Sequence, residues 1–178
     1  WRARQPNTYH LEYGYSCMGY EIAGGLGVKM ADPLRDVFVM VGDGSYLMLN
    51  AEIATSVMLG HKIIIVVLDN RGYGCIQRLQ LATGSPSFNN LLEDCGAPPM
   101  IDFAAHAKSM GAGAVHVKDI AELKSAMRAA RAASTTQVIV IDTTPWRTTD
   151  DGGAWWEVAV PEVSPRAEVA QAHASWLE

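Results

Sequence analysis

The sequence predicts an α/β protein with a doubly wound parallel sheet flanked by helices. Short apolar runs alternate with longer segments of helical periodicity, and this alternation is typical of strands that run parallel in one sheet. The runs at 37–41 and 63–68 contain no polar residue. Such runs are expected of strands that are buried on both faces.

The first half of the chain predicts two helices and two strands. A helix in the small, apolar segment 16–30 ends at Asp32-Pro33, because proline stops a helix. A strand at 37–41 follows. A second helix covers 50–59, with Asn50 as its N-cap and Gly60 as its stop. The β-branched run at 63–68 is the central strand.

Residues 71–100 contain four glycines and three prolines and show no clear period. We expect a long loop with a short helix after Tyr73, and a loop of this length usually has a function. Alternation then resumes with a helix at 102–110, a strand at 114–117, a helix at 119–133 capped by Asp119, and a strand at 137–142. We treat residues 1–178 as a single domain. Residues 14–142 form its core, and the tail 143–178 packs over the sheet.

Composition narrows the function classes. The net charge is −5 and no run of Lys and Arg occurs, so we expect no nucleic-acid partner. The longest apolar stretch, 63–68, is far too short to span a bilayer. The three cysteines are widely spaced and odd in number. This pattern disfavours a disulfide framework or a zinc site and indicates a cytoplasmic protein.

Two polar turns follow the two best-defined strands. Gly42-Asp43-Gly44-Ser45 comes after the first, and Asp69-Asn70-Arg71-Gly72 comes after the second. Ligands of parallel sheets bind at the carboxyl ends of the strands. Glycines let backbone N–H groups approach phosphate oxygens. A carboxylate and an amide oxygen are hard ligands for magnesium, and a diphosphate completes such a site. Asp43 and Asn70 fit these roles.

The segment from Gly42 to Gly74, GDGSYLMLNAEIATSVMLGHKIIIVVLDNRGYG, resembles the motif of thiamine-diphosphate-dependent enzymes. That motif begins with Gly-Asp-Gly and ends in an Asn pair after a helix and a strand. Asp69 stands where the first Asn is expected, and Asn70 matches the second, which is the ligand. The resemblance implies that Asp43 and Asn70 bind magnesium through their side chains and Gly72 through its carbonyl. It implies further that Gly42, Gly44 and Ser45 line the diphosphate, with N–H donors at Gly44 and Ser45.

The segment Gly14-Tyr15-Ser16-Cys17-Met18-Gly19 resembles the cofactor-contacting turn of the acetolactate-synthase-like branch. The resemblance makes Met18 the apolar wedge under the bent cofactor, and the carbonyl of Ser16 an acceptor for its aminopyrimidine. An ordinary core methionine is the alternative for Met18.

Further segments, including YHLEYGYSCMGYEIAGGLGVK and GGAWWEVAVPEVS, resemble the carboxyl-terminal domain of the trihydroxycyclohexanedione hydrolases of myo-inositol breakdown. The resemblance covers nearly the whole chain. It implies a hydrolase that uses thiamine diphosphate and Mg²⁺ to break a ring C–C bond of a cyclic 1,2-diketone and release 5-deoxyglucuronate.

The resemblance also implies what lies outside the sequence. The Glu that activates the cofactor belongs to a pyrimidine-binding domain supplied by a partner subunit, so no catalytic residue is assigned in this chain. We expect a homodimer or homotetramer. Because the sequence begins at Trp1 and not at Met, we expect a fragment that lacks the pyrimidine-binding and middle domains and is inactive alone.

Four alternatives stay open. The first is that the chain belongs to a different enzyme of the same branch, such as a decarboxylase, a carboligase or an acetolactate-type synthase. The second is that it is the diphosphate-binding subunit of a two-chain enzyme, and the third is that it is a non-catalytic regulatory domain. A dinucleotide-binding domain is disfavoured because Gly24-Gly25-Leu26-Gly27 lies inside a helical pattern.

Some polar and aromatic residues remain without an assigned function. His10 and Glu12 precede the cofactor turn and could face substrate. His106 and His116 are expected to have packing roles, and Trp155 and Trp156 to pack against the sheet. Cys75 is given no catalytic role.

Overall fold

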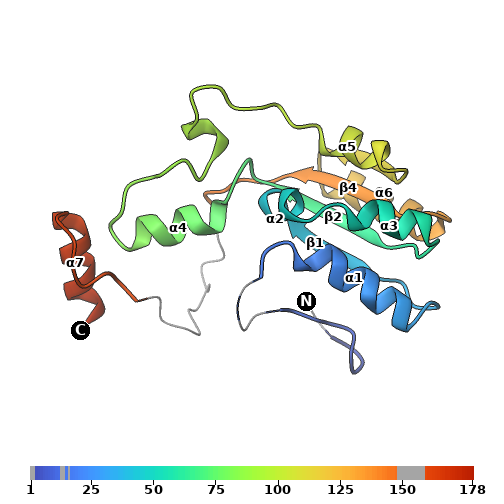
Figure 1. The fold of residues 1–178 in the computed structure, drawn as a ribbon, viewed down its shortest axis with the longest axis horizontal. Coiled ribbons are helices and arrows are strands. Elements are labelled where there is room, and N and C mark those ends of the chain that lie inside the picture. Colours follow the sequence, from blue (N-terminus) through green and yellow to red (C-terminus); the bar gives the residue numbers. More distant parts are fainter. Residues whose placement is uncertain (1–2, 13–14, 16, 148–158) are drawn as a thin grey trace. The chain divides into compact units, whose positions relative to one another are not determined.

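The computed structural model describes residues 3–12, 15, 17–147 and 159–178. These fall into two compact units. The first holds the chain up to Leu68 together with Asp102–Ile141, and the second holds Asp69–Ile101 together with Asp142–Glu178. Figure 1 traces the elements along the chain. In the part of the chain described, no helix is both long and apolar enough to cross a membrane.

A four-stranded sheet forms the centre of the first unit. Its strands are β1 (Phe38–Gly42), β2 (Ile64–Asp69), β3 (Gly113–Val117) and β4 (Gln137–Asp142), in the order β1-β2-β4-β3. β1 is parallel to β2, and β3 is parallel to β4. The four strands predicted from apolar runs are confirmed to within one residue at each end, and so is the predicted fold class.

Helices cover both faces of this sheet. On one face, α6 (Ile120–Ala132) packs against alternate strand residues, among them Ile64, Val66 and Ile139. On the other face lie α1 (Tyr20–Ala31), α2 (Asp43–Met48), α3 (Glu52–Met58) and α5 (Phe103–Ser109), and Figure 1 shows α6 behind the sheet with α1 and α3 in front. The two central strands, β2 and β4, are buried on both faces, which explains why they read as continuous apolar runs. In β1 only alternate residues are buried, and Phe38 and Met40 are exposed, so burial of that strand on both faces, expected from its apolar run, was wrong.

One glycine sets the approach of α1 to β1. A Cβ added at Gly25 would collide with the Val39 side chain. The Gly-rich sequence of α1 therefore serves close packing of a helix on a strand, in the helical segment that the sequence predicted. Asp32 follows α1 directly, as expected.

Capping residues fix several helix boundaries. Asp119 accepts a hydrogen bond from Glu122 N at 2.8 Å, which confirms its predicted role as the N-cap of α6. Asp102 caps α5 in the same way through Ala105 N. The predicted N-cap of α3 was wrong: Ala51 occupies that position, without a side-chain cap. The preceding short helix α2 ends close by, and Asn50 contributes its backbone carbonyl to Ile53 N instead.

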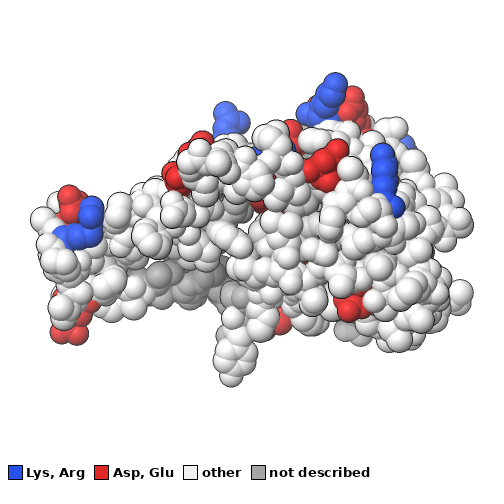
Figure 2. Space-filling view, turned by 45° about the horizontal axis from the view of Figure 1, so that its top comes forward, with Lys and Arg blue, Asp and Glu red and all other residues white. Residues whose placement is uncertain are grey.

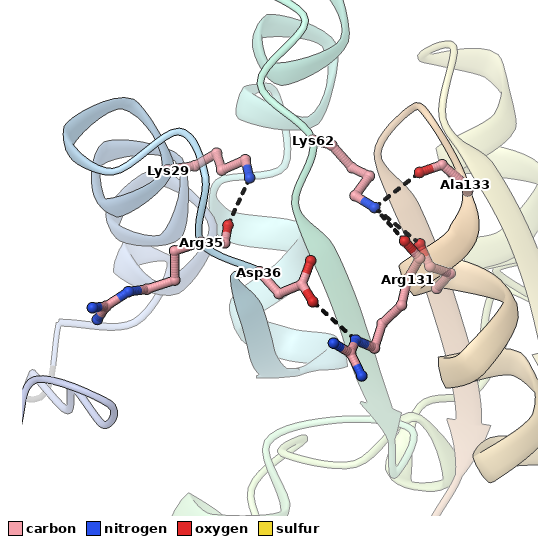
Figure 3. Close-up of polar contacts among 7 residues, drawn as sticks. Lys29, Arg35, Asp36, Lys62, Arg131 and Ala133 are labelled. Atoms are coloured by element: carbon pink, nitrogen blue, oxygen red, sulfur yellow. Dashed lines mark hydrogen bonds and ion pairs between the residues drawn. The ribbon is translucent and has the colours of Figure 1, made fainter. Parts of the chain in front are cut away.

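Lysines stabilise the end of the sheet where β1 and β2 begin (Figure 3). Lys62 Nζ donates to the carbonyls of Arg131 at 2.7 Å and Ala133 at 2.8 Å, at the carboxyl end of α6. A cation there satisfies carbonyls that have no partner within the helix and opposes the helix dipole. Lys29 Nζ donates to the Arg35 carbonyl at 2.6 Å, and Arg131 pairs with Asp36 at 2.9 Å.

The second unit contains α4 (Gly74–Ala82), a 3₁₀ turn η1 (Leu92–Asp94) and α7 (Ala167–Trp176). The helix expected after Tyr73 is thereby confirmed. Buried Gln77 of α4 holds the loop that follows, because its Oε1 accepts from Ser87 Oγ at 3.2 Å and Asn90 Nδ2 at 3.0 Å. Trp155 and Trp156 lie outside the described residues, so packing of the tail over the sheet stays a prediction.

Charged side chains are interspersed on the face drawn in Figure 2. Lys and Arg alternate there with Asp and Glu, and most of the surface seen is neutral.

Candidate functional site

The first part of the candidate site is the junction of β1 and α2. Gly42 is extended, and Asp43 is the first residue of α2. The side chain of Asp43 is almost wholly buried, with 3% exposed, and Ser45 is buried beside it. A Cβ added at Gly42 would meet nothing within 4 Å, so the space at this turn is open. The sequence predicted only a turn here and missed α2, because glycine at position 44 disfavours a helix.

The second part is the turn before α1, which the structure brings to Ser45. Gly19 N donates to Ser45 Oγ at 3.0 Å and to Glu21 Oε2 at 3.0 Å. Gly19 has φ +91°, and a Cβ there would lie 3.1 Å from Leu49 Cβ, so only glycine suits the position. Met18 is 40% exposed, which argues against the core-methionine alternative. Ser16 lies outside the described residues.

Glu12 and His10 hold this turn on its other side. The carboxylate of Glu12 accepts from Cys17 N at 2.8 Å and from Tyr15 N at 3.3 Å. The hydrogen bond from Cys17 is the main reason why the pKa of Glu12 lies below its usual 4.5. His10 Nε2 lies 2.9 Å from Tyr20 Oη. Both residues therefore make structural contacts, and a position facing substrate stays a prediction.

The third part follows β2, where Asp69 organises the turn. Asp69 is 1% exposed, and its carboxylate accepts from Arg71 N at 2.9 Å and lies 3.2 Å from the Arg71 guanidinium. Its carbonyl accepts from Thr143 N at 2.7 Å. Arg71 has φ +60°, a conformation that a local Asp acceptor stabilises. The carboxylate thus has a structural role at the position where the thiamine-diphosphate motif expects Asn.

Glycines on either side of Tyr73 accommodate the ligand residues of the predicted motif. Gly72 has φ +148° and forms an antiparallel bridge with Leu91, and a Cβ there would collide with the Asn90 carbonyl. At position 74 a Cβ would come within 3.0 Å of Asn70 Nδ2. Gly74 thus leaves room for the Asn70 side chain. Larger residues at 72 or 74 would displace the loop or the amide.

The strand register relates the two turns along the sheet. Gly42 of β1 is the register partner of Leu68 of β2. Asp43 directly follows the first of these residues in the sequence, and Asp69 directly follows the second. Asp43 and Ser45 belong to the first compact unit, whereas Asn70 and Gly72 belong to the second. Among the described residues, no three His, Cys, Asp or Glu side chains gather as a metal-binding group. The assignment of Asp43, Asn70 and Gly72 to magnesium stays a prediction.

The remaining candidate residues lie elsewhere. His106 Nδ1 lies 2.9 Å from the hydroxyl of buried Tyr46, which confirms a packing role. His116 is exposed on β3, and Cys75 is exposed at the start of α4. Sequence reasoning missed Glu21, whose carboxylate accepts from Ser45 Oγ at 2.9 Å. Its only signal was an acidic residue in the first turn of a helix.

Comparison with known proteins defines the class to which this domain belongs. Residues 1–143 match the family described as "Thiamine pyrophosphate enzyme, C-terminal TPP binding domain". The chain belongs to this family of cofactor-binding domains.

Individual relatives are more specific. The chain is 43% identical to "3D-(3,5/4)-trihydroxycyclohexane-1,2-dione hydrolase" of Bacillus cereus strain AH820 and of Bacillus anthracis, over 98% of this chain and 28% of each relative. A relative of that name from Bacillus thuringiensis strain Al Hakam is 42% identical over the same shares. The chain thus spans 28% of the length of these curated relatives.

A solved structure supports the fold. The "Rhodococcus jostii RHA1 thiamine diphosphate-dependent 4-hydroxybenzoylformate decarboxylase" superimposes with a TM-score of 0.65 at 23% identity. The match covers 71% of this chain and 23% of that chain.

Proposed function

We propose that this chain holds the Mg²⁺–diphosphate end of thiamine diphosphate in an enzyme that hydrolyses a C–C bond of a cyclic 1,2-diketone. The 43% identity to relatives named as trihydroxycyclohexanedione hydrolases carries the substrate assignment. The cofactor assignment is carried by the buried carboxylate of Asp43, which begins α2 beside an open glycine turn.

The donor set fits a magnesium diphosphate. Asp43 would supply one anionic oxygen, Asn70 an amide oxygen and Gly72 a carbonyl oxygen. The backbone N–H groups of Gly44 and Ser45 would donate to phosphate oxygens, and the open space at Gly42 leaves room for these oxygens.

Bound thiamine diphosphate supplies a nucleophilic carbon that also acts as an electron sink. This chain's own residues would bind and orient it: Met18 would support the rings, and the carbonyl of Ser16 would be the acceptor for the aminopyrimidine. The overall reaction consumes one water. The bond between the two carbonyl carbons breaks, one carbon gains hydrogen and becomes an aldehyde, and the other gains hydroxyl and becomes the acid of 5-deoxyglucuronate.

The proposed active assembly requires a second polypeptide surface. The activating Glu is expected on a pyrimidine-binding domain of a partner subunit, in a cytoplasmic homodimer or homotetramer. A decarboxylase, carboligase or acetolactate-type synthase is the nearest alternative activity, since such enzymes use the same cofactor chemistry. A two-chain enzyme differs only in where the pyrimidine-binding domain is encoded, and the intact mass of the native chain separates these cases.

Calorimetry on the natural protein that contains this chain tests the metal assignment. Asp43→Ala should abolish Mg²⁺-dependent thiamine diphosphate binding, and Asn70→Ala should weaken it strongly, because oxygen ligands are lost. Asp36→Ala is the matched control, since Asp36 is a carboxylate at the opposite end of β1 that pairs with Arg131. Unchanged affinity in Asp43→Ala would contradict the assignment. Assays with the cyclic diketone and with 2-oxo acids then decide between hydrolysis and decarboxylation.

A further inference from the structure

Ser45 and Gly19 connect two parts of the cofactor site that are distant in the sequence. Gly19 N donates to Ser45 Oγ at 3.0 Å and also to Glu21 Oε2 at 3.0 Å. Ser45 Oγ in turn donates to Glu21 Oε1 at 2.9 Å. The three groups form a closed ring of hydrogen bonds, in which one carboxylate bridges the turn before α1 and the first turn of α2.

The ring leaves Ser45 with no proton for any other acceptor. A hydroxyl carries one donor hydrogen, and that hydrogen is directed at Glu21. The side chain of Ser45 is therefore a structural link, and only its backbone N–H remains for the diphosphate. The hydroxyl of Ser45 binds Glu21, and its backbone N–H is the group left for the diphosphate. The position of that N–H therefore depends on Glu21.

A carboxylate at this place is electrostatically unfavourable for an anion site, since like charges repel. Asp43 already supplies a negative charge for the metal, and the diphosphate adds more. The hydrogen-bond geometry explains why a carboxylate occupies position 21. A carboxylate accepts two hydrogen bonds at once, here one from the Ser45 hydroxyl and one from the N–H of Gly19. Hydrogen bonds to an ionised acceptor are also stronger than neutral ones.

We propose that Glu21 is a positioning residue that fixes the Met18 turn to the diphosphate-binding turn through Ser45 and Gly19. The inference rests on the proposed cofactor function. Met18 immediately precedes Gly19, so a shift of Gly19 moves the base of the Met18 side chain. We assign Glu21 no contact with metal or cofactor: its carboxylate binds Gly19 N and Ser45 Oγ, and it sets the distance between the turn proposed to hold the diphosphate and the turn proposed to support the rings.

The test uses the natural protein that contains this chain, with Glu21→Ala, Glu21→Gln, Ser45→Ala and the double variant Glu21→Ala/Ser45→Ala. Glu52→Ala is the control, because Glu52 is also half-buried in the first turn of a helix, and the described residues show no side-chain hydrogen bond for it. Calorimetry measures the Mg²⁺-dependent affinity for thiamine diphosphate. Near-ultraviolet circular dichroism reports the environment of the bound rings, and kcat is measured at saturating cofactor.

Glu21→Ala should weaken cofactor affinity roughly tenfold, about the loss of one hydrogen bond to a charged group, and should lower kcat and change the dichroism at saturation. Glu21→Gln should stay within about threefold of the unaltered protein, since its amide can donate to Ser45 Oγ and accept from Gly19 N. The double variant should be no worse than the more affected single variant, as expected for residues that act as a unit.

Two results would overturn the proposal: a Glu21→Ala protein that matches Glu52→Ala in affinity, kcat and dichroism, or additive losses in the double variant. If Glu21→Ala does not fold, as melting curves would show, Ser45→Ala breaks the same ring from the other side and Glu21→Gln tests the geometry. Failure of the proposed function has a different signature, because the unaltered protein would then show no Mg²⁺-dependent cofactor binding at all.

Discussion

The hydroxyl of Tyr46 lies 2.9 Å from Nδ1 of His106 and thereby joins α2 to α5. The ring of Tyr46 is fully buried and meets Phe103 edge to face, with centroids 5.3 Å apart. Tyr46 is three residues beyond Asp43 on the same short helix. An isolated helix of this length would not be stable in water, so the packing of Tyr46 holds the Asp43 turn in place.

Tyr46→Phe should keep the aromatic packing and lose the hydrogen bond, at a cost of about 1 kcal/mol in the local free energy of opening. Hydrogen exchange of peptides from α2 and α5 measures this loss. Tyr20→Phe is the control, because its hydroxyl makes an equally short contact with His10 at a more exposed place. A loss at Tyr20 as large as that at Tyr46 would show that burial does not strengthen the bond.

Burial raises the pKa of Tyr46 to about 12, from 10.0 in its absence. The folded state therefore keeps the proton longer than the unfolded chain does. The contribution of Tyr46 to stability should be complete below pH 10 and should be lost as the pH rises from 10 to about 12. Comparison of alkaline unfolding between the unaltered protein and Tyr46→Phe isolates this residue from other tyrosines and lysines. Identical pH profiles would contradict the expected linkage.

A buried relay of hydroxyls connects α3 to the residues directly before β2 and β4. Ile63 N donates to Thr136 Oγ1 at 3.2 Å, and Thr136 Oγ1 lies 2.8 Å from Ser56 Oγ. Ser56 Oγ donates to the Ile53 carbonyl at 2.7 Å, so Thr136 must be the donor to Ser56. Each hydroxyl in the relay thus gives one proton and accepts another.

Thr136→Val should destabilise the sheet by about 1–3 kcal/mol, because it leaves the buried Ile63 N–H without an acceptor and removes the donor to Ser56 Oγ, without changing the volume much. Thr136→Ser should restore most of the loss, since the hydroxyl returns. Thr135→Val serves as the control, as its hydroxyl makes no hydrogen bond among the described residues. Hydrogen exchange of β2 and β4 peptides gives the free energies. A neutral Thr136→Val would mean that water satisfies these groups.

The sequence predicted the elements whose signals are local. Continuous apolar runs predicted β2 and β4, and an acidic N-cap residue before a segment of helical periodicity predicted α6. The helix α2 was missed because its stability comes from Tyr46, whose partners Phe103 and His106 are distant in the sequence. Local propensity carries no information on such contacts.

The same division applies to the candidate site. Asp43 and Asn70 were predicted because glycines beside an oxygen ligand form a recognisable local pattern. Glu21 was missed because its function depends on Ser45, which reaches it only in the folded chain. Asp69 was read as a tolerated departure from a motif, whereas its contacts with Arg71 give it a structural role.

Met18 offers the clearest separation between a packing role and a cofactor role. Its side chain is 40% exposed, so truncation should cost far less than the roughly 2–5 kcal/mol expected of a buried methionine. As a wedge under the cofactor, Met18→Ala should lower kcat at saturating cofactor more than it lowers cofactor affinity. Met18→Leu should be mild, because it conserves most of the volume.

Met30→Ala is the matched control, since Met30 is 51% exposed on α1. Its replacement should leave stability, affinity and kcat unchanged. Melting curves and steady-state kinetics on the three variants in the natural protein give the comparison. If a folded, cofactor-loaded Met18→Ala protein keeps full kcat, Met18 is not the wedge, and the assignment of the whole Tyr15–Gly19 turn to the cofactor fails with it. If kcat falls while Met30→Ala is normal, the loss belongs to the position of Met18 and not to the removal of an exposed methionine.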